Sequence, residues 1–188
     1  MTTKAQIRKQ IKAAKASIDK EHKRLQAQCV FDFIETLQLF KKAKNILLYY
    51  SLPDELSTHE VIEKWAKVKN IYLPRVNDSN LMEIVPYDGS LHTGAYNIQE
   101  PVGEPVTDTS VIDLIIVPGI AFDRDMNRLG RGKGYYDRFL VTTNAPTIGV
   151  GYDCQIVDSL PAEEHDIKLN AVITTTYHFI SSTLELCL

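Results

Sequence analysis

The spacing of apolar residues predicts that the chain begins with helices. Over about the first forty residues an apolar side chain recurs every three or four positions, which is typical of an amphipathic helix. The positions that form this stripe are Ile7, Ile11, Ala14, Ile18, Leu25, Cys29, Phe33 and Leu37. Thr2 or Thr3 can supply the side-chain cap at the start of the first helix.

After residue 40 the pattern changes to short apolar runs separated by helical or polar stretches. Residues 45–50 (NILLYY) and 111–117 (VIDLIIV) are almost wholly apolar, which is typical of strands covered on both faces. Further strands are predicted at 71–76, 81–85, 147–151 and 171–174, and helices at 59–68 and 135–140. Pro74 weakens the strand prediction in which it lies. Residues 86–110 are rich in Gly, Pro, Asp and Thr, which predicts a long loop.

Strands that alternate with helices predict an α/β fold. We expect three layers, with a largely parallel central sheet flanked by helices. A chain of 188 residues with 44% apolar residues suits a single domain, residues 1–188, with a sizeable core.

Composition and charge then narrow the class of protein. The formal net charge is −3, whereas a general nucleic-acid binder is more often basic, so no nucleic-acid partner is expected. The three cysteines are widely spaced and suggest thiols in a reducing compartment. The first residues lack the apolar region of a secretory signal, and no stretch has the length of a membrane span. We therefore expect a cytoplasmic protein and, for want of an evident apolar interface, a monomer.

The segment 128–140 (RLGRGKGYYDRFL) carries the most specific chemistry. Glycines at three alternate positions let the backbone approach a ligand closely and adopt positive φ. Arg131 and Lys133 supply positive charge between them, and a helix is predicted to follow, whose first amides favour an anion. In an open α/β sheet, ligands bind beyond the carboxyl ends of the strands. The segment therefore predicts a phosphate-binding loop.

Common phosphate signatures do not match this loop. The P-loop pattern needs Ser or Thr after Gly-Lys, where Gly134 stands, and the dinucleotide pattern lacks its third glycine. A flexible surface turn with solubilising charges is the plain alternative. Tyr135, Tyr136 and Asp137 favour a ligand that has rings together with a metal that bridges phosphates. An RNA-binding loop is a weaker alternative in an acidic protein.

The sequence GRGKGYYDRFL resembles the signature of the 5-formyltetrahydrofolate cyclo-ligase family, and further segments resemble that family in the same order. These are Lys4-x-x-Ile7-Arg8, Tyr49–Glu55, Tyr96–Pro101, Val117–Asp123, Gly149–Asp158, Leu160-Pro161, His165-Asp166 and Val172–Thr174. Three positions depart from the family: Met126 and Asn97 stand in place of glycines, and Asn170 in place of an aspartate.

The resemblance implies an enzyme that uses ATP and Mg²⁺ to convert 5-formyltetrahydrofolate to 5,10-methenyltetrahydrofolate, with release of ADP and phosphate. The positions that resemble ATP contacts are Lys4, Arg8, Arg128, Leu129, Gly130, Arg131, Gly132, Lys133, Gly134, Tyr135 and Tyr136. Those that resemble folate contacts are Tyr50, Glu55, Arg131, Gly132, Lys133, Gly134 and Tyr135. Asp137 and Asp166 resemble magnesium ligands, and Arg131 and Lys133 are the expected catalytic residues.

Several of these residues also have a purely structural interpretation. Lys4 and Arg8 lie four positions apart, so they share one helix face and would by spacing alone be a solvated basic face. Asp137 could favour a helix N-terminus by its charge, and Tyr50 could belong to the core. Trp65 is predicted to be a core residue, and Arg75 could reach the carboxylates of a folate.

Three other functions stay open at this point. The first is a sugar-phosphate isomerase or CoA-transferase-like enzyme on a similar scaffold, which would not need ATP. The second is a nucleotide-binding module without turnover. The third is a family member that has kept the fold and lost the activity.

Overall fold

The computed structural model describes residues 2–94, 99–161, 163 and 166–185. Three helices open the chain: α1 (Lys4–Ala16), α2 (Lys20–Thr36) and α3 (Gln38–Lys42). Thr3 caps α1, because its side chain accepts a hydrogen bond from the amide of Gln6 while the Gln6 side chain accepts one from the amide of Thr3. The helical prediction for the first forty residues is confirmed, with breaks near Ser17 and at Leu37.

The main sheet has seven strands in the order β12-β11-β9-β6-β1-β2-β3. Their bounds are β1 (Asn45–Leu47), β2 (Asn70–Val76), β3 (Met82–Pro86), β6 (Leu114–Pro118), β9 (Thr147–Val150), β11 (Ala171–Ile173) and β12 (His178–Ile180). The five central strands pair in parallel, and the two edge strands, β3 and β12, are antiparallel to their neighbours. The predicted α/β fold with a largely parallel sheet is therefore confirmed.

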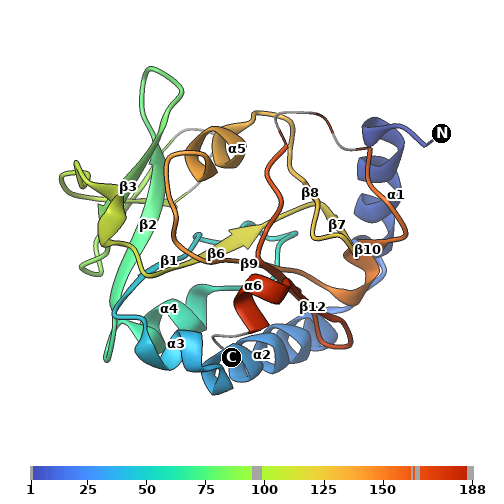
Figure 1. The fold of residues 1–188 in the computed structure, drawn as a ribbon, viewed down its shortest axis with the longest axis horizontal. Coiled ribbons are helices and arrows are strands. Elements are labelled where there is room, and N and C mark those ends of the chain that lie inside the picture. Colours follow the sequence, from blue (N-terminus) through green and yellow to red (C-terminus); the bar gives the residue numbers. More distant parts are fainter. Residues whose placement is uncertain (1, 95–98, 162, 164–165, 186–188) are drawn as a thin grey trace.

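The sheet is the middle of three layers (Figure 1). On one face α2, α3 and α4 (His59–Trp65) pack against it, and Trp65, only 1% exposed, lies in that core as predicted. The other face is covered by α5 (Tyr135–Leu140), whose Phe139 packs near Phe122. The bounds of α5 are those that the sequence predicted.

A small second sheet connects α1 to the rest of the molecule. It contains β7 (Ala121–Asp123), β8 (Arg128–Leu129) and β10 (Ile156–Val157), in the order β10-β7-β8. Ile7 and Ile11 of α1 are buried against Ile120 and Leu129. This packing holds the N-terminal helix against a segment more than one hundred residues further along the chain.

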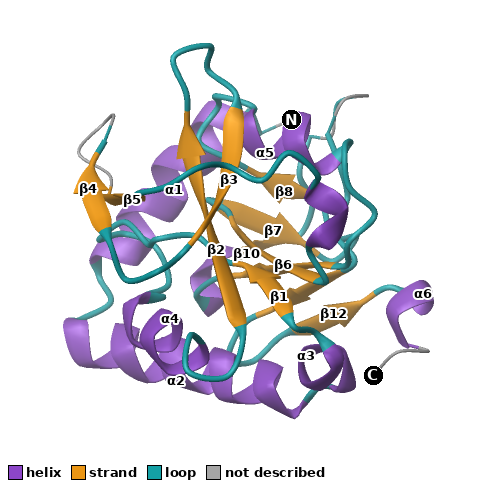
Figure 2. Cartoon of the chain, turned by 90° about the vertical axis from the view of Figure 1, so that its left-hand side faces the viewer, coloured by secondary structure: helices purple, strands orange, loops and turns teal. Residues whose placement is uncertain are grey.

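The segments predicted as loops contain more structure than expected. Residues 86–110 include the antiparallel pair β4 (Leu91–Thr93) and β5 (Gln99–Pro101) and the start of a 3₁₀ turn, Thr109–Val111, so β6 begins only at Leu114. Figure 2 shows this pair beside the long β2–β3 hairpin. The loop before residue 134 includes β7 and β8, and β12 was not predicted at all. Strands of two or three residues are too short to produce a visible alternation, which is why the sequence did not predict them.

Two other predicted elements are shorter in the structure, the strand 45–50 and the helix 59–68. β1 ends at Leu47, and residues 48–50 continue without strand geometry toward the site described below. Along β2, β1 pairs only as far as Tyr72, so Pro74 lies where that side of the strand has no partner strand. The helix predicted at 59–68 ends at Trp65. Two short elements remain. A 3₁₀ turn, Asp153–Gln155, comes directly before β10, and the helix α6 (Ser182–Glu185) follows β12.

The strand order reverses between β1 and β6. From β1 the chain continues to β2 on one side, whereas β6 lies on the other side of β1 and is followed outward by β9 and β11. The chain segments that follow β1 and β6 run to opposite sides at such a point. A crevice therefore remains between them, beyond the carboxyl ends of the two strands. The fold therefore predicts a ligand site next to Leu48–Tyr50 and Pro118–Ile120.

Candidate active site

A cavity of about 390 Å³ occupies this crevice. Tyr49 and Tyr50 line it from the end of β1, and Pro118–Ile120 line it from the end of β6. The opposite wall is the glycine loop and the first turn of α5, through Arg128, Gly130, Arg131 and Lys133–Asp137. Most of the positions predicted as ATP or folate contacts therefore surround a single cavity.

Two of the three loop glycines adopt the left-handed backbone conformation. Gly132 has φ 96° and Gly134 has φ 67°, and Gly134 is also the residue from which α5 begins. A side chain at either position would be strained, because L-residues rarely adopt these angles. The prediction of positive φ is confirmed at these two positions and does not hold at Gly130, which is absent from the positive-φ residues.

Arg131 lies between two carboxylates that the YYSLPDE segment supplies. Its Nη2 atom is 2.6 Å from Asp54 Oδ1 and 3.0 Å from Glu55 Oε1, and its Nε atom is 3.2 Å from Glu55 Oε1. Burial alone would lower the pKa of Arg131, but its hydrogen bond to Asp54 and the two negative charges raise it above its ordinary value. The guanidinium is therefore held in one orientation at the cavity wall.

A buried lysine holds Asp54 from the other side. Lys15 Nζ is 2.8 Å from Asp54 Oδ2 and 2.7 Å from the Asp54 carbonyl oxygen, and the Lys15 side chain is 2% exposed. Burial would raise the pKa of Asp54, but the hydrogen bonds from Lys15 and Arg131 lower it below its ordinary value. Sequence reasoning missed Lys15 and Asp54. The available signal for Lys15 was its position four residues after Ile11, on the buried stripe of α1.

Of the two predicted phosphate contacts of α1, Arg8 contacts the glycine loop and Lys4 pairs with two carboxylates near residue 165. Arg8 Nε donates a hydrogen bond to the carbonyl oxygen of Gly130 at 3.0 Å, across 122 residues of sequence. Lys4 Nζ lies 2.8 Å from Asp166 Oδ2 and 3.1 Å from Glu163 Oε1. Burial would lower the pKa of Lys4, and the bonds to Asp166 and Glu163 raise it. Neither Lys4 nor Arg8 lines the cavity itself.

The two predicted metal ligands, Asp137 and Asp166, are engaged in separate ion pairs. Asp137 Oδ1 lies 2.7 Å from Arg128 Nη2 and lines the cavity, whereas Asp166 pairs with Lys4 and does not line it. Among the described residues no group of three or more His, Cys, Asp and Glu side chains is arranged to hold a metal ion.

The aromatic residues differ in how they are held. Tyr50 lines the cavity and stacks on His59 with ring centroids 4.3 Å apart. Tyr135 lies under the guanidinium of Arg138, and Tyr136 lies under that of Arg128. The hydroxyl oxygen of Tyr136 is buried and has no hydrogen-bond partner within the part of the chain that the structure describes. Burial raises the pKa of this hydroxyl, so it is a protonated donor.

Three other residues singled out in the sequence lie elsewhere. Arg75 is held by Glu83 at 2.9 Å and donates to the carbonyl oxygen of Gly103, so it does not face the cavity. Asn170 links the starts of β9 and β11 by accepting hydrogen bonds from the amide and hydroxyl of Thr147, which agrees with leaving it out of the site. Asn97 and His165 fall outside the described residues.

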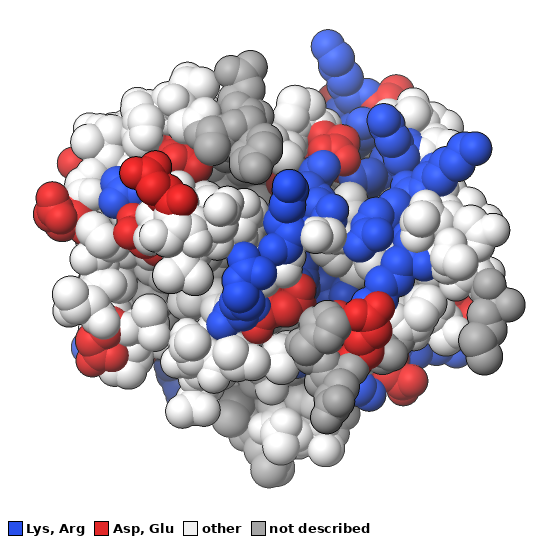
Figure 3. Space-filling model, turned by 90° about the horizontal axis from the view of Figure 1, so that it is seen from above, with Lys and Arg blue, Asp and Glu red and all other residues white. Residues whose placement is uncertain are grey.

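The face on which α1 and α5 lie is rich in positive charge (Figure 3). Lys and Arg side chains gather over the centre and one side of this view, with some Asp and Glu side chains among them. The fold and the site thus define a class: an α/β protein whose glycine loop and cations line a cavity suited to an anion, at the point where the strand order reverses.

Comparison with known proteins identifies the family. The model of the 5-formyltetrahydrofolate cyclo-ligase family matches residues 1–175. The chain is 30% identical to 5-formyltetrahydrofolate cyclo-ligase of Mus musculus over 92% of this chain and 93% of the relative, and 32% identical to that of Haemophilus influenzae over 87% and 93%. It is 36% identical to the Escherichia coli K12 protein of the same name over 70% and 78%.

Solved structures agree. A 5,10-methenyltetrahydrofolate synthetase from Aquifex aeolicus superposes with a TM-score of 0.86 at 32% identity, covering 95% of this chain and 93% of that one. One from Mycoplasma pneumoniae, at 24% identity and a TM-score of 0.72 over 92% and 98%, shares the fold. The chain belongs to the 5-formyltetrahydrofolate cyclo-ligase family, and it is an ATP-dependent ligase of folate one-carbon metabolism. The resemblance seen in the sequence is confirmed, and the isomerase or transferase alternative is not supported.

Proposed function

We propose that the cavity at the ends of β1 and β6 is where the cyclo-ligase reaction takes place, with the formyl group of 5-formyltetrahydrofolate beside Arg131 and Lys133. The observation that carries this proposal is that the cationic glycine loop forms one wall of the cavity whose other wall is the Tyr50–Glu55 segment. A folate ring and the end of a triphosphate can therefore meet between these two walls.

The reaction has a simple chemical logic. A formamide oxygen is a poor leaving group, and transfer of the γ-phosphoryl group of ATP to that oxygen makes it a good one. The folate nitrogen at position ten then attacks the formyl carbon, the new ring closes and phosphate leaves. The protein needs no covalent nucleophile for this sequence. Its task is to align the formyl oxygen with the γ-phosphate and to neutralise developing charge.

The ATP contacts proposed are those of α1 and the glycine loop. Lys4, Arg8, Arg128, Arg131 and Lys133 would neutralise phosphate oxygens, and Leu129, Gly130, Gly132, Gly134, Tyr135 and Tyr136 would form the surrounding wall. The hydrogen bond from Arg8 to Gly130 supports this, since it brings α1 against the loop. Because Arg131 is already held by Asp54 and Glu55, a phosphate would compete with these carboxylates for its guanidinium.

The folate contacts proposed are Tyr50, Glu55 and the loop residues Arg131, Gly132, Lys133, Gly134 and Tyr135. Glu55 is half-buried and its orientation is fixed, because Oε2 accepts a hydrogen bond from the amide of Leu52 and Oε1 accepts from Arg131. A carboxylate held in this way can accept hydrogen bonds from the N–H groups of a pterin. Tyr136 lines the same cavity, and its buried hydroxyl has no hydrogen-bond partner among the described residues, so a bound ligand could accept from it.

Magnesium is the proposed metal, and Asp137 is its first candidate ligand. Mg²⁺ commonly takes one or two carboxylates and completes its shell with phosphate oxygens and water, so Asp137 with Asp166 would suffice. Asp137 fits better, since it lines the cavity, whereas Asp166 does not. When bound, the metal would neutralise charge on the transferred phosphoryl group. Arg128 and Lys4, now paired with these aspartates, would then be available to phosphate oxygens.

The remaining proposals concern organisation and location. We propose that residues 1–188 form one cyclo-ligase domain that acts as a monomer in the cytoplasm. No helix in the described ranges is long and apolar enough to cross a membrane. One relative, from Arabidopsis thaliana, is mitochondrial by name, so the compartment needs its own test by cell fractionation.

The decisive experiment follows formation of the methenyl product by its near-ultraviolet absorption, with Mg-ATP and 5-formyltetrahydrofolate. We expect an absorbance rise that needs ATP and that Arg131→Ala reduces by at least about 100-fold, as is common when a donor to a transition state is lost. Arg124→Ala is the matched control, because Arg124 is exposed and does not line the cavity.

Two outcomes would contradict the proposal. If folded protein binds ATP but gives no product, the chain is a binding module or an inactive member of the family. If Arg131→Ala and Arg124→Ala turn over equally fast, the reaction takes place elsewhere in the molecule.

A further inference from the structure

Glu100 of β5 is a carboxyl group that lines the first cavity and that the contacts proposed above leave unused. Its side chain is only 7% exposed. Among the described residues its one charged neighbour is His92, whose Nε2 lies 3.9 Å from Glu100 Oε2, beyond hydrogen-bond distance, on a side chain that is 47% exposed. A buried carboxyl group without a donor is costly, so a ligand in the cavity is the natural source of one.

The fold keeps a space for this carboxyl group. Gly94, directly after β4, lies against Glu100, and a Cβ placed on Gly94 would come within 2.1 Å of Glu100 Oε2 and 2.3 Å of its Cδ. Gly94 is absent from the residues with positive φ, so its backbone would accept an alanine. Glycine is therefore required at this position for space, and a side chain there would push the carboxyl group aside.

The carboxyl group and the cations occupy different sides of the cavity. β5 packs beside β2, and Pro74 and Val76 of β2 line the cavity together with Glu100. Arg131 and Lys133 belong to the glycine loop, on another wall. The cavity therefore has one side that suits phosphate and one side that suits a group with hydrogen-bond donors.

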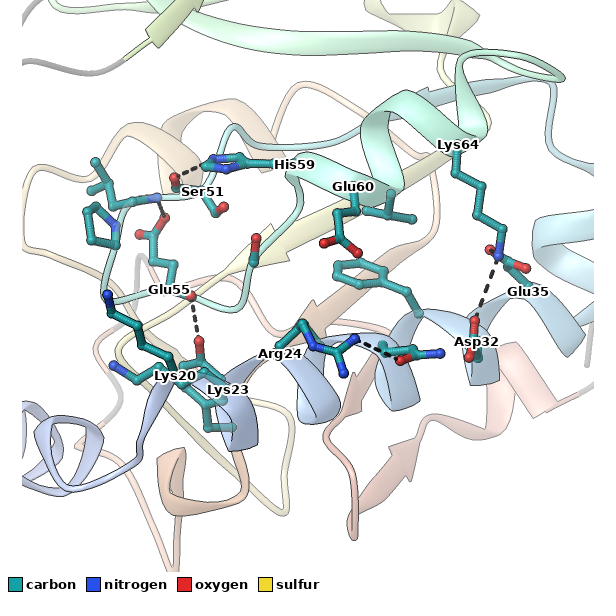
Figure 4. A pocket seen from close by; sticks show the side chains of 18 residues that line it. Lys20, Lys23, Arg24, Asp32, Glu35, Ser51, Glu55, His59, Glu60 and Lys64 are labelled. Carbon is teal, nitrogen blue, oxygen red and sulfur yellow. Dashed lines mark hydrogen bonds and ion pairs between the residues drawn. The ribbon is translucent and has the colours of Figure 1, made fainter.

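Glu55, the carboxylate already proposed to contact the folate, is partly occupied. Its Oε1 atom accepts hydrogen bonds from Arg131. Its Oε2 atom accepts from the amide of Leu52 at 3.0 Å, which Figure 4 shows from the side of a second cavity, of about 510 Å³, between α2 and α4. No described residue donates to Glu100 in this way, so both of its oxygens are available to a ligand.

The geometry of a carboxylate selects between the two rings that the substrates bring. The pterin of a folate carries an amino group at position 2 beside the N–H at position 3, so two parallel donors match two oxygens, as in the pairing of arginine with a carboxylate. Adenine places its amino group beside a ring nitrogen that is an acceptor, which a carboxylate oxygen would oppose. The carboxyl group therefore favours the pterin over the adenine.

We propose that Glu100 accepts hydrogen bonds from the 2-amino group and the adjacent N–H of the pterin, and so is a specificity-determining residue for the folate. This inference rests on the proposed function, which places the folate in the first cavity. The 2-amino group and the formyl nitrogen belong to different rings of the pterin. Holding the first at β5 therefore turns the second toward Arg131 and Lys133.

The test uses an analogue of 5-formyltetrahydrofolate in which a methyl group replaces the 2-amino group. We expect the wild type to prefer the natural substrate by about 10- to 100-fold in kcat/KM, the loss typical of a missing hydrogen bond to a charged group. In Glu100→Ala this preference should fall below about threefold, with KM for the folate raised and KM for ATP unchanged. Glu104→Ala, an exposed change outside the cavity, should keep the wild-type preference.

Two further variants separate binding from structural support. Gly94→Ala keeps the carboxyl group and displaces it, so its preference should fall as that of Glu100→Ala does. Glu100→Gln preserves the shape of the side chain, and its midpoint of urea unfolding without ligands should equal or exceed that of the wild type. A clearly lower midpoint would show that Glu100 supports the fold instead.

The remaining outcomes distinguish this inference from the proposed function. Wild-type turnover with a preference that survives in Glu100→Ala and Gly94→Ala, or a rise in KM for ATP instead of the folate, overturns the role of Glu100 and leaves the proposed function standing. Absence of turnover with any folate overturns the proposed function. Calorimetric titration with 5-formyltetrahydrofolate then still compares the wild type with Glu100→Ala, and equal Kd values overturn the role of Glu100 as well.

Discussion

Lys15 donates hydrogen bonds from one ammonium group to both the side chain and the backbone carbonyl of Asp54, at 2.8 and 2.7 Å. Asp54 in turn accepts from Arg131 at 2.6 Å. A lysine on the buried face of α1 therefore fixes the carboxylate that orients the arginine at the cavity wall. This connection makes the N-terminal helix a support of the proposed active site as well as the source of two proposed phosphate contacts.

Removing the ammonium group at residue 15 should therefore affect stability and activity together. We expect Lys15→Met to lower the free energy of unfolding by about 1.5–3 kcal/mol, the usual range for a hydrogen bond to a charged group. It should lower kcat/KM by less than Arg131→Ala does, since Arg131 retains Glu55. Lys12→Met, an exposed change in the same helix, is the control for urea unfolding and for kinetics. Equal unfolding curves and equal kcat/KM for Lys15→Met and Lys12→Met would contradict a supporting role for Lys15.

The unpartnered hydroxyl of Tyr136 gives a prediction in which stability and activity move in opposite directions. Tyr136→Phe removes a buried polar group that has no partner among the described residues. The free energy of unfolding should therefore stay the same or rise by up to about 1 kcal/mol. Activity should fall by about tenfold if a bound ligand accepts a hydrogen bond from this hydroxyl, since Tyr136 lines the cavity. Thermal unfolding without ligands and initial rates on the same preparation test both parts. A loss of stability with full activity would show that the hydroxyl is only structural.

Asp54 makes folding sensitive to acid. Its pKa in the folded protein lies below the ordinary value of 3.8, so its ion pairs contribute stability above that pH and lose it as the pH falls through the lower, folded value. We expect Asp54→Asn to be less stable than the wild type near neutral pH. The difference should shrink steadily below about pH 4. Urea unfolding of both proteins at a series of pH values measures this difference in stability. A difference that stays constant down to about pH 2 would show that ionisation of Asp54 is not its cause.

Met126 occupies a backbone conformation that suits glycine. Its φ is 62°, so the turn after β7 does require the left-handed region where the family commonly has glycine. Its side chain offsets part of the cost by packing near the core that includes Phe122. Met126→Gly should therefore change stability by less than about 1 kcal/mol. Met126→Val should cost about 1–2 kcal/mol, because a β-branched residue is poorly tolerated there. The control is Met82→Val in β3, where Val is favoured, and it should lower stability less than Met126→Val does. A larger stability loss for Met82→Val than for Met126→Val would refute this explanation.

The sequence predicted well the parts of the fold whose signal is local. The helix 135–140 was predicted with correct bounds, because three glycines precede it and an apolar pair closes it. The cation-rich loop was likewise recognised, and the structure places it at a cavity. The paired strands Leu91–Thr93 and Gln99–Pro101 were missed, since Gln99 and Glu100 carry no strand signal and the pairing itself stabilises them.

Contacts between distant residues could not be derived from spacing. Nothing in the composition of α1 indicates that Lys15 meets Asp54, or that Lys4 meets Asp166 across 162 positions. The second cavity depends on how α2 and α4 are set apart, which only the packed structure defines. Pattern indicates which residues have suitable chemistry, and packing decides which of them face one another.

The position of α1 has a consequence for how the protein is made. Ile7 and Ile11 have their apolar partners at Ile120, Leu129 and Leu160, so this helix leaves the ribosome long before the surface that it covers exists. Until about residue 160 has emerged, its apolar face is open to chaperones and proteases.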